Sequence, residues 1–166
     1  ELTYLDINSN IITDVSPLAG LVNLEYLNIL FNPVQDIRPL YGLEKLQSLY
    51  LSGGNLTDGI SGEGMSNLKE LSFLWLCACR IKDISGLKGM TNLKDMLLEY
   101  NEIEDISSLE FIPNLSSVSL YKNNISDISP LVRNSGIGEG DFISLIGNPL
   151  SDESINVHIP ALKARG

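Results

Sequence analysis

Histidine and cysteine are scarce in this chain, and sites that depend on them are correspondingly disfavoured. The 166 residues include one histidine and two cysteines, Cys77 and Cys79, which lie two positions apart. Two cysteines can form at most one disulfide, so the fold cannot depend on a disulfide framework. A disulfide between such close neighbours in one segment would also be strained. They also supply only part of the ligand set that a structural zinc ion takes. We therefore expect two free thiols, no metal ion and no cofactor.

Long apolar runs and positive charge are scarce as well. The longest uninterrupted apolar run, Phe73 to Cys79, has seven residues, whereas a membrane-spanning helix needs about 20. Only 11 Lys and Arg oppose 21 Asp and Glu, which gives a formal charge of −10 at pH 7, and phosphate backbones repel such a chain. The sequence therefore predicts neither membrane insertion nor nucleic-acid binding.

What the chain does contain is a repeat, spelled L-x-x-L-x-L-x-x-N-x-I, that recurs from end to end. Successive units begin 22 or 25 residues apart, which is typical of leucine-rich repeats. The seven units begin at Leu2, Leu24, Leu46, Leu71, Leu93, Leu115 and Gly140. Counted from the first residue of a unit, apolar residues fall at offsets 0, 3, 5, 10, 13, 16 and 19. A single unit cannot cover its own apolar face, so stability has to come from stacking.

This spacing predicts the fold. Offsets 3 and 5 alternate as in a strand with two residues facing the core, and strands that all run in one direction must be parallel. We predict an α/β solenoid: a right-handed leucine-rich-repeat arc with a concave parallel sheet of about seven strands and short 3-10 or helical turns on the convex side. We expect residues 1–166 to form a single domain with a C-terminal cap over about 151–166 and with the N-terminal cap missing, since Leu2 already opens a strand. In the cap, Ile155, Ile159 and Leu162 are expected on one helical face, with Pro160 bending or restarting the helix.

Two polar columns accompany the apolar one. At offset 8 a carboxamide can satisfy backbone groups that turn inside the coil, and the predicted structural ladder is Asn10, Asn32, Cys79 in place of Asn, Asn101, Asn123 and Asn148. In unit three Gly54 interrupts it. At offset 12 the chain places Asp14, Asp36, Asp58, Asp83, Asp105, Asp127 and Asp152. We expect these carboxylates to cap convex turns; the alternative, a calcium array, needs more oxygens than one carboxylate per unit provides.

Three residues are inserted in each of units three and six, in the Gly-rich stretch 59–65 and in 133–138. Convex connections tolerate insertions, so sequence drift is the simpler interpretation and a second contact surface is the alternative.

Aromatic residues collect on the outward side of the predicted strands. Offsets 2, 4 and 6 point away from the core and offset 7 follows at the strand's edge, and together these positions hold nine of the eleven aromatics, including Phe142. Cross-strand pairing explains part of this enrichment, but exposing large rings forgoes burial worth a few kcal/mol each. The predicted ligand-binding residues on the concave face are Tyr4, Tyr26, Phe31, Tyr50, Phe73, Trp75, Leu97, Glu99, Tyr100 and Tyr121.

Catalytic groups do not assemble in this pattern. His158, the one histidine, falls in the terminal cap, and the clustered carboxylates Glu102, Glu104 and Asp105 fall on a solvated rim. We predict no catalytic residues and no enzymatic activity.

The segments Asp14-Val15-Ser16-Pro17-Leu18 and Asp127-Ile128-Ser129-Pro130-Leu131 resemble the D-I-S-P-L convex segments of internalin-like leucine-rich repeats. The resemblance covers essentially the whole chain, and it implies a bacterial protein that is extracellular or at the cell surface. We predict a monomeric, non-enzymatic module that binds a protein partner on its aromatic concave sheet. The alternatives are a glycan-binding adhesin, a structural spacer, and the substrate-recruiting segment of a larger protein.

Overall fold

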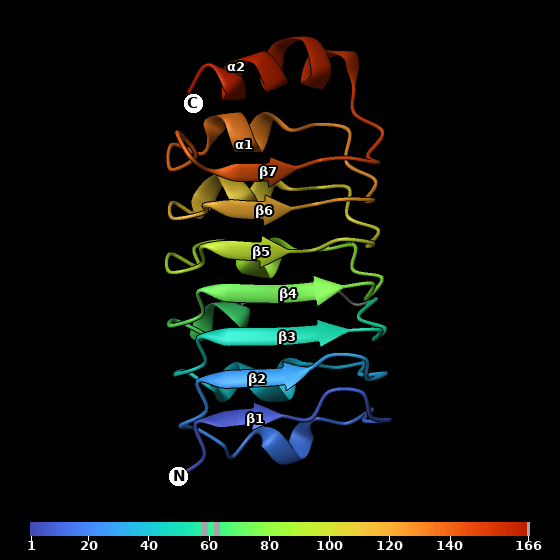
Figure 1. The fold of residues 1–166 in the computed structure, drawn as a ribbon, viewed down its shortest axis with the longest axis vertical. Helices are drawn as coiled ribbons and strands as arrows, with labels where there is room; N and C mark the ends of the chain where they lie inside the picture. Colours follow the sequence, from blue (N-terminus) through green and yellow to red (C-terminus); the bar gives the residue numbers. More distant parts are fainter. Residues whose placement is uncertain (58–59, 62–63, 166) are drawn as a thin grey trace.

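Seven parallel strands form one sheet along the inner side of a solenoid in a computed structural model, which describes residues 1–57, 60–61 and 64–165 (Figure 1). The strands pair in the order of the sequence, so each coil lies on the coil before it. They are β1 (Tyr4–Asp6), β2 (Tyr26–Ile29), β3 (Ser48–Ser52), β4 (Phe73–Cys77), β5 (Asp95–Leu97), β6 (Ser117–Ser119) and β7 (Phe142–Ser144). The predicted fold class, a leucine-rich-repeat arc, is confirmed.

Short helical turns return the chain along the convex side. They are η1 (Ser16–Leu18), η2 (Arg38–Gly42), η3 (Met65–Asn67), η4 (Ser85–Leu87), η5 (Ser107–Phe111) and α1 (Ser129–Arg133). The chain ends in η6 (Ser154–His158), which is a π-helical turn, and α2 (Ile159–Lys163). In the described part of the chain, no helix has the length and apolar character that a membrane crossing requires.

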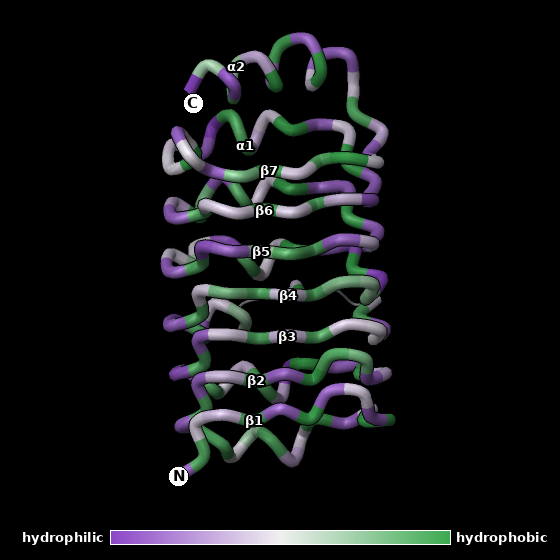
Figure 2. Tube along the Cα trace, viewed as in Figure 1, coloured by the Kyte–Doolittle hydropathy of each residue, from purple (hydrophilic) through white to green (hydrophobic). Residues whose placement is uncertain are grey.

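The strand register follows the repeat offsets. Leu27, Leu49 and Leu74 are partners across β2, β3 and β4, and all three are fully buried. Their outward neighbours Tyr50 and Trp75 are also direct partners, on the opposite side of the sheet. Figure 2 shows apolar stretches recurring at corresponding places in successive coils. The core is therefore one continuous column that each unit extends.

The asparagine at offset 8 bonds to the coil before it as well as to its own turn. Asn101 donates through Nδ2 to the carbonyls of Leu76 at 2.7 Å and Leu98 at 3.0 Å. Its Oδ1 accepts the N–H groups of Cys79 at 3.0 Å and Ile81 at 3.1 Å. Comparable bonds to the preceding coil are made by Asn32, Asn123 and Asn148. The carboxamides thus tie neighbouring coils together where the strand pairing ends.

Units three and four replace this arrangement with backbone bonds. A Cβ at Gly54 would stand 2.5 Å from the Val34 carbonyl oxygen, so no larger side chain fits there. Leu56 donates its N–H to the Cys79 carbonyl at 2.8 Å, where other coils donate to a carboxamide. The buried Cys79 thiol donates to the Cys77 carbonyl at 3.2 Å. Both cysteines are free thiols.

Five of the aspartates at offset 12 precede the convex turns and accept the N–H group two residues ahead, whereas Asp152 lies within the helical C-terminal segment and does not precede it as predicted. Asp14 accepts from Ser16 at 2.8 Å and Asp127 from Ser129 at 2.7 Å, and these backbone bonds lower the pKa of both carboxyls. The same bond is made by Asp36, Asp83 and Asp105. Among the described residues, which exclude Asp58, no three His, Cys, Asp or Glu side chains gather as a metal site would require. The geometry is that of turn capping.

The C-terminal segment differs from the prediction at one residue. Ile159 and Leu162 pack against the core, but Ile155 is 48% exposed. In η6 the N–H of Ile159 donates to the Ser154 carbonyl, five residues back. A π-helical turn takes more residues than an α-helical one, so Ile155 is rotated off the face that the other two share.

Candidate interaction surface

A continuous row of rings crosses the outward face of the first four strands. Tyr4 and Tyr26 stack with centroids 4.3 Å apart and planes 6° from parallel. Tyr26 then meets Tyr50 at 5.1 Å, and Tyr50 meets Phe73 at 4.7 Å and Trp75 at 5.9 Å. We call these five residues the aromatic stripe. Ring pairs at such distances are favourable beyond the area they bury, so the stripe is held as a unit.

The stripe is partly covered by its own members. Tyr4, at the end of the row, is 57% exposed, whereas the other four rings are half-buried. Burial, and next the hydrogen bond with Tyr4, raises the pKa of Tyr26 to about 12. Burial also raises the pKa of Tyr50. These phenols therefore stay neutral near physiological pH and present uncharged, amphipathic surface.

The indole of Trp75 is fixed from the side by two polar groups. Its Nε1–H donates to Cys77 Sγ at 2.7 Å, and the Cys77 thiol in turn donates to Glu99 Oε2 at 2.6 Å. Burial, followed by the bond to Glu99, raises the pKa of Cys77 to about 12. A thiol that stays protonated is a poor nucleophile. Cys77 therefore orients the ring beside it and is not set up to react.

A second aromatic group lies on the later coils, at the end of the strands. Tyr100 and Tyr121 meet edge to face, with centroids 5.1 Å apart. The ammonium of Lys122 stands 5.3 Å from the Tyr100 ring centre and 5.5 Å from that of Tyr121, within cation–π range. The hydrogen bond with Tyr121 raises the pKa of Tyr100. We call these three residues the tyrosine–lysine cluster.

Between the two aromatic groups the sheet carries smaller and more polar side chains. Asp95 pairs with Phe73, and Leu97 pairs with Trp75, across β4 and β5. Further along, Ser117 and Ser119 continue these two rows on β6. The outward face of β5 and β6 therefore carries no ring, and Phe142 on β7 places a ring in the row of Asp95 and Ser117 again.

Comparison with known proteins agrees with this geometry. Residues 1–42 match the family model described as Leucine Rich repeats (2 copies). An internalin C2 from Listeria monocytogenes is 27% identical with a TM-score of 0.77, over 95% of this chain and 67% of that one. An internalin inlF from the same organism is 28% identical with a TM-score of 0.51, over 91% and 56%. A leucine-rich-repeat protein of Leptospira interrogans has a TM-score of 0.81 at 19% identity, over 99% and 47%.

The chain is a leucine-rich-repeat protein that resembles the Listeria internalins. No curated protein sequence matches it. It spans about two thirds of the first structure and about half of the other two. The likeness to the Leptospira protein, at its lower identity, shows the fold alone.

All ten predicted ligand-binding residues of this leucine-rich-repeat protein lie on the outward face or at its rim. The structure divides eight of them into the aromatic stripe, the pair of Tyr100 and Tyr121 on the later coils, and Phe31 at the rim. Leu97 and Glu99 lie next to Trp75 and Cys77 and connect the first two groups. Their role in binding remains a prediction.

One feature of the rim was not predicted. The residue at offset 7 has a left-handed backbone in every unit, at Ser9, Phe31, Gly53, Ala78, Tyr100, Lys122 and Gly147. The strand ends there in a sharp turn, and the side chain is directed outward: Phe31 has φ 55° and is 67% exposed. A bulky residue in this conformation is uncommon. The glycines at 53 and 147 in this column were the signal that could have revealed the turn.

Proposed function

We propose that residues 1–166 form one non-enzymatic recognition domain that binds a protein partner on its concave face, with the aromatic stripe as the main contact. The observation that carries this proposal is the packing of five rings into one row on the open face of a rigid sheet. Domains of the leucine-rich-repeat fold usually bind proteins and usually lack catalytic sites, which agrees with it.

Tyrosine and tryptophan dominate the binding energy of many protein interfaces. Here their orientations are set before binding, because each ring rests on its neighbour and Trp75 is held by Cys77 and Glu99. Side chains that are already ordered lose less entropy on association. The stripe therefore has the composition and the preorganisation of an interface centre.

The charge around the stripe indicates the chemistry of the partner. Asp6 is the next outward residue after Tyr4 on β1. Asp95 and Glu99 border the stripe at its other end, next to β4. Opposite charge at an interface rim speeds association and improves specificity. We infer a partner with apolar or aromatic side chains at its centre and basic residues around them.

A glycan is the second candidate ligand, because open ring faces such as that of Tyr4 lie next to carboxylates that can accept hydroxyl protons. The resemblance to internalins further supports an extracellular or cell-surface location, where partners of either kind are met.

The test compares rings on the two sides of the solenoid. Trp75→Ala and Tyr50→Ala should weaken binding of the partner by about tenfold or more. Phe111→Ala is the matched control, because Phe111 is also exposed, at 46%, but lies on the convex side under the Lys88 ammonium. Affinity is measured by calorimetry or surface plasmon resonance on a purified partner, with each variant's thermal unfolding recorded alongside.

Unchanged affinity in both concave variants would refute the proposal, as would an equal loss in Phe111→Ala. If Trp75→Phe restores most of the affinity, the ring itself makes the contact. Binding of an oligosaccharide, with no protein partner retained, would favour the glycan.

A further inference from the structure

The outward side of β5 carries a carboxylate that the fold leaves without a partner. Asp95 is half-buried between Phe73 on β4 and Ser117 on β6, which are its direct neighbours across the sheet. In the described part of the chain, no group forms a hydrogen bond or an ion pair with the Asp95 carboxylate. A carboxylate that has lost part of its hydration gains more from a counter-charge than a fully exposed one does. Asp95 is therefore a charge that a bound cation would satisfy.

The two lysines of this region do not neutralise Asp95. Lys94 precedes it in the chain, but its side chain is exposed and the two residues form no ion pair. The Lys122 ammonium lies over the rings of Tyr100 and Tyr121 at the end of the strands. Glu99, on the same side of the sheet, adds a second negative charge, and its Oε2 is bonded only to the neutral Cys77 thiol. The local charge is therefore negative.

The ring of Phe73 presents a flat apolar surface beside this carboxylate. Tyr50 covers one face of the ring, with centroids 4.7 Å apart and planes at 27°. Since Tyr50 belongs to β3, the opposite face of Phe73 is directed toward β5, where Asp95 lies. Among the described residues, no other ring stacks on Phe73. One planar group can therefore be added to the stack on that face.

Two serines on β6 contribute short side chains and free hydroxyls. Ser117 and Ser119 hold the outward positions that Phe73 and Trp75 hold on β4. Ser119 is only 7% exposed, yet its hydroxyl makes no hydrogen bond within the described residues. A hydroxyl oxygen accepts N–H donors as readily as a carbonyl does. The carboxylate, the open ring face and the two hydroxyls lie together, and we call Phe73, Asp95, Ser117 and Ser119 the Asp95 site.

We propose that the Asp95 site binds an arginine side chain of the protein partner. The guanidinium group lies flat on the open face of Phe73, and its N–H groups donate to the Asp95 carboxylate and the serine hydroxyls. Arginine fits better than lysine, because its planar group stacks on aromatic rings and its N–H fork matches a carboxylate. The inference rests on the proposed function and deepens it, since the site adjoins the aromatic stripe through Phe73 and names one residue that the partner must supply.

The probe is acetyl-arginine amide, which reports on the Asp95 site without a partner protein. The controls are acetyl-citrulline amide, which has a similar shape but no charge, and acetyl-lysine amide, which has the charge but no planar group. Binding is followed by NMR at the Asp95 and Ser117 amides and the Phe73 ring. The arginine compound should bind about tenfold more tightly than the citrulline compound and about threefold more tightly than the lysine compound. Equal binding of the three, or no saturable shift at these residues, would overturn the proposal.

Variants separate the role of the charge from that of the ring. Asp95→Asn should weaken binding of the arginine compound about tenfold. Glu104→Gln removes the same charge from an exposed turn residue and should leave binding unaltered. Phe73→Leu keeps an apolar side chain but loses the flat face, so the preference for arginine over lysine should disappear. Unchanged binding in Asp95→Asn, or an unchanged preference in Phe73→Leu, would refute the site.

Measurements on a purified partner distinguish this inference from the proposed function. Asp95→Asn should weaken partner binding about tenfold as well. If Trp75→Ala weakens partner binding and Asp95→Asn does not, the arginine site is wrong and the proposed function stands. If the arginine compound binds at Asp95 while neither variant changes affinity for the partner, the site is supported and the proposed function is refuted.

Discussion

Leu49 and Leu51 in β3 point inward and are fully buried, while Ser48 and Tyr50 on the other side of the same strand are half-buried. The two sides also vary differently along the solenoid. Inward positions hold a leucine, isoleucine, valine or methionine in every coil, whereas outward positions vary among aromatic residues, leucine, serine, asparagine, cysteine and aspartate. Inward residues must fit the core residues of the coils above and below, whereas outward residues are held only by contacts on the open face, such as those between neighbouring rings. Each strand thus has a core side with a fixed kind of residue and an open side with a variable one.

The largest test of this separation compares adjacent residues of β4. Leu74→Ala removes a fully buried side chain and leaves a cavity, so we expect the free energy of unfolding to fall by about 2–5 kcal/mol. The matched outward change, Trp75→Ala, should lower the free energy of unfolding much less than Leu74→Ala does, but should weaken binding of the partner much more. Chemical denaturation followed by circular dichroism measures the first quantity, and calorimetry with the partner measures the second. A similar stability loss in both variants would show that the stripe belongs to the core.

An intermediate effect is expected inside the asparagine ladder. Asn101→Ala leaves the buried N–H groups of Cys79 and Ile81 without their acceptor, and an unsatisfied buried donor costs about 1–3 kcal/mol. The control is Asn10→Ala at the same offset in unit one, where the side chain is exposed and bonds only within its own turn. Equal denaturation midpoints for the two variants would contradict this role of the ladder.

The inward pattern was readable from the sequence because stacking repeats it in every unit. The offsets of Leu27, Leu49 and Leu74 predicted their register, and the column of aspartates predicted the capped turns. Contacts between rings could not be predicted in the same way. The repeat offsets showed which rings lie outward, but the approach of Tyr50 to both Phe73 and Trp75 depends on side-chain rotamers that the spacing does not specify. The bond from Trp75 to Cys77 is of the same kind.

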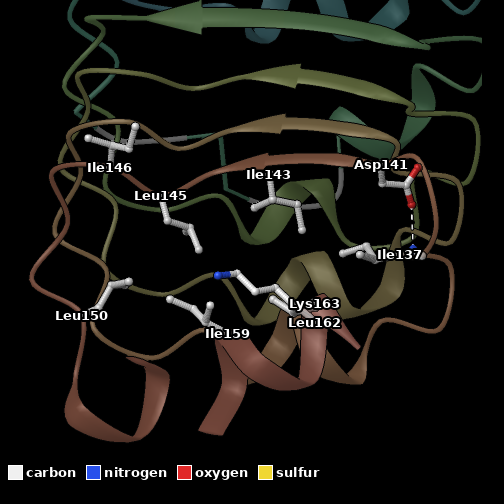
Figure 3. Close-up of a pocket in the computed structure, with 10 residues that line it drawn as sticks. Ile137, Asp141, Ile143, Leu145, Ile146, Leu150, Ile159, Leu162 and Lys163 are labelled. Atoms are coloured by element: carbon white, nitrogen blue, oxygen red, sulfur yellow. Dashed lines mark hydrogen bonds between the residues drawn. The ribbon is translucent and has the colours of Figure 1, made fainter. Parts of the chain in front are cut away.

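The incomplete burial of Ile143 and Leu145, which line the cavity in Figure 3, was missed for a different reason. Ile143 and Leu145 fit the repeat as well as any other pair, and nothing in their own unit reveals whether a neighbour covers them. Their partial burial follows from how η6 and α2 pack on the last coil, and the π-helical turn that exposes Ile155 belongs to that same packing. Sequence periodicity describes the middle of a solenoid better than its ends.

The smallest expected effect concerns the rim, where an outward residue with a strained backbone lowers the stability of the fold. Phe31 adopts a left-handed backbone at φ 55°, which disfavours residues with a Cβ by roughly 1–2 kcal/mol, and most of its ring is exposed. Phe31→Gly should therefore stabilise the fold by about 0.5–1 kcal/mol, since glycine tolerates this conformation but gives up some entropy of the unfolded chain. Gly53→Ala, at the same offset in the next coil, is the reciprocal change and should destabilise by a similar amount. If the unfolding temperature does not rise for Phe31→Gly, contacts of the Phe31 ring offset the strain of its backbone. If the unfolding temperature rises while affinity for the partner falls, the strained residue is retained for binding.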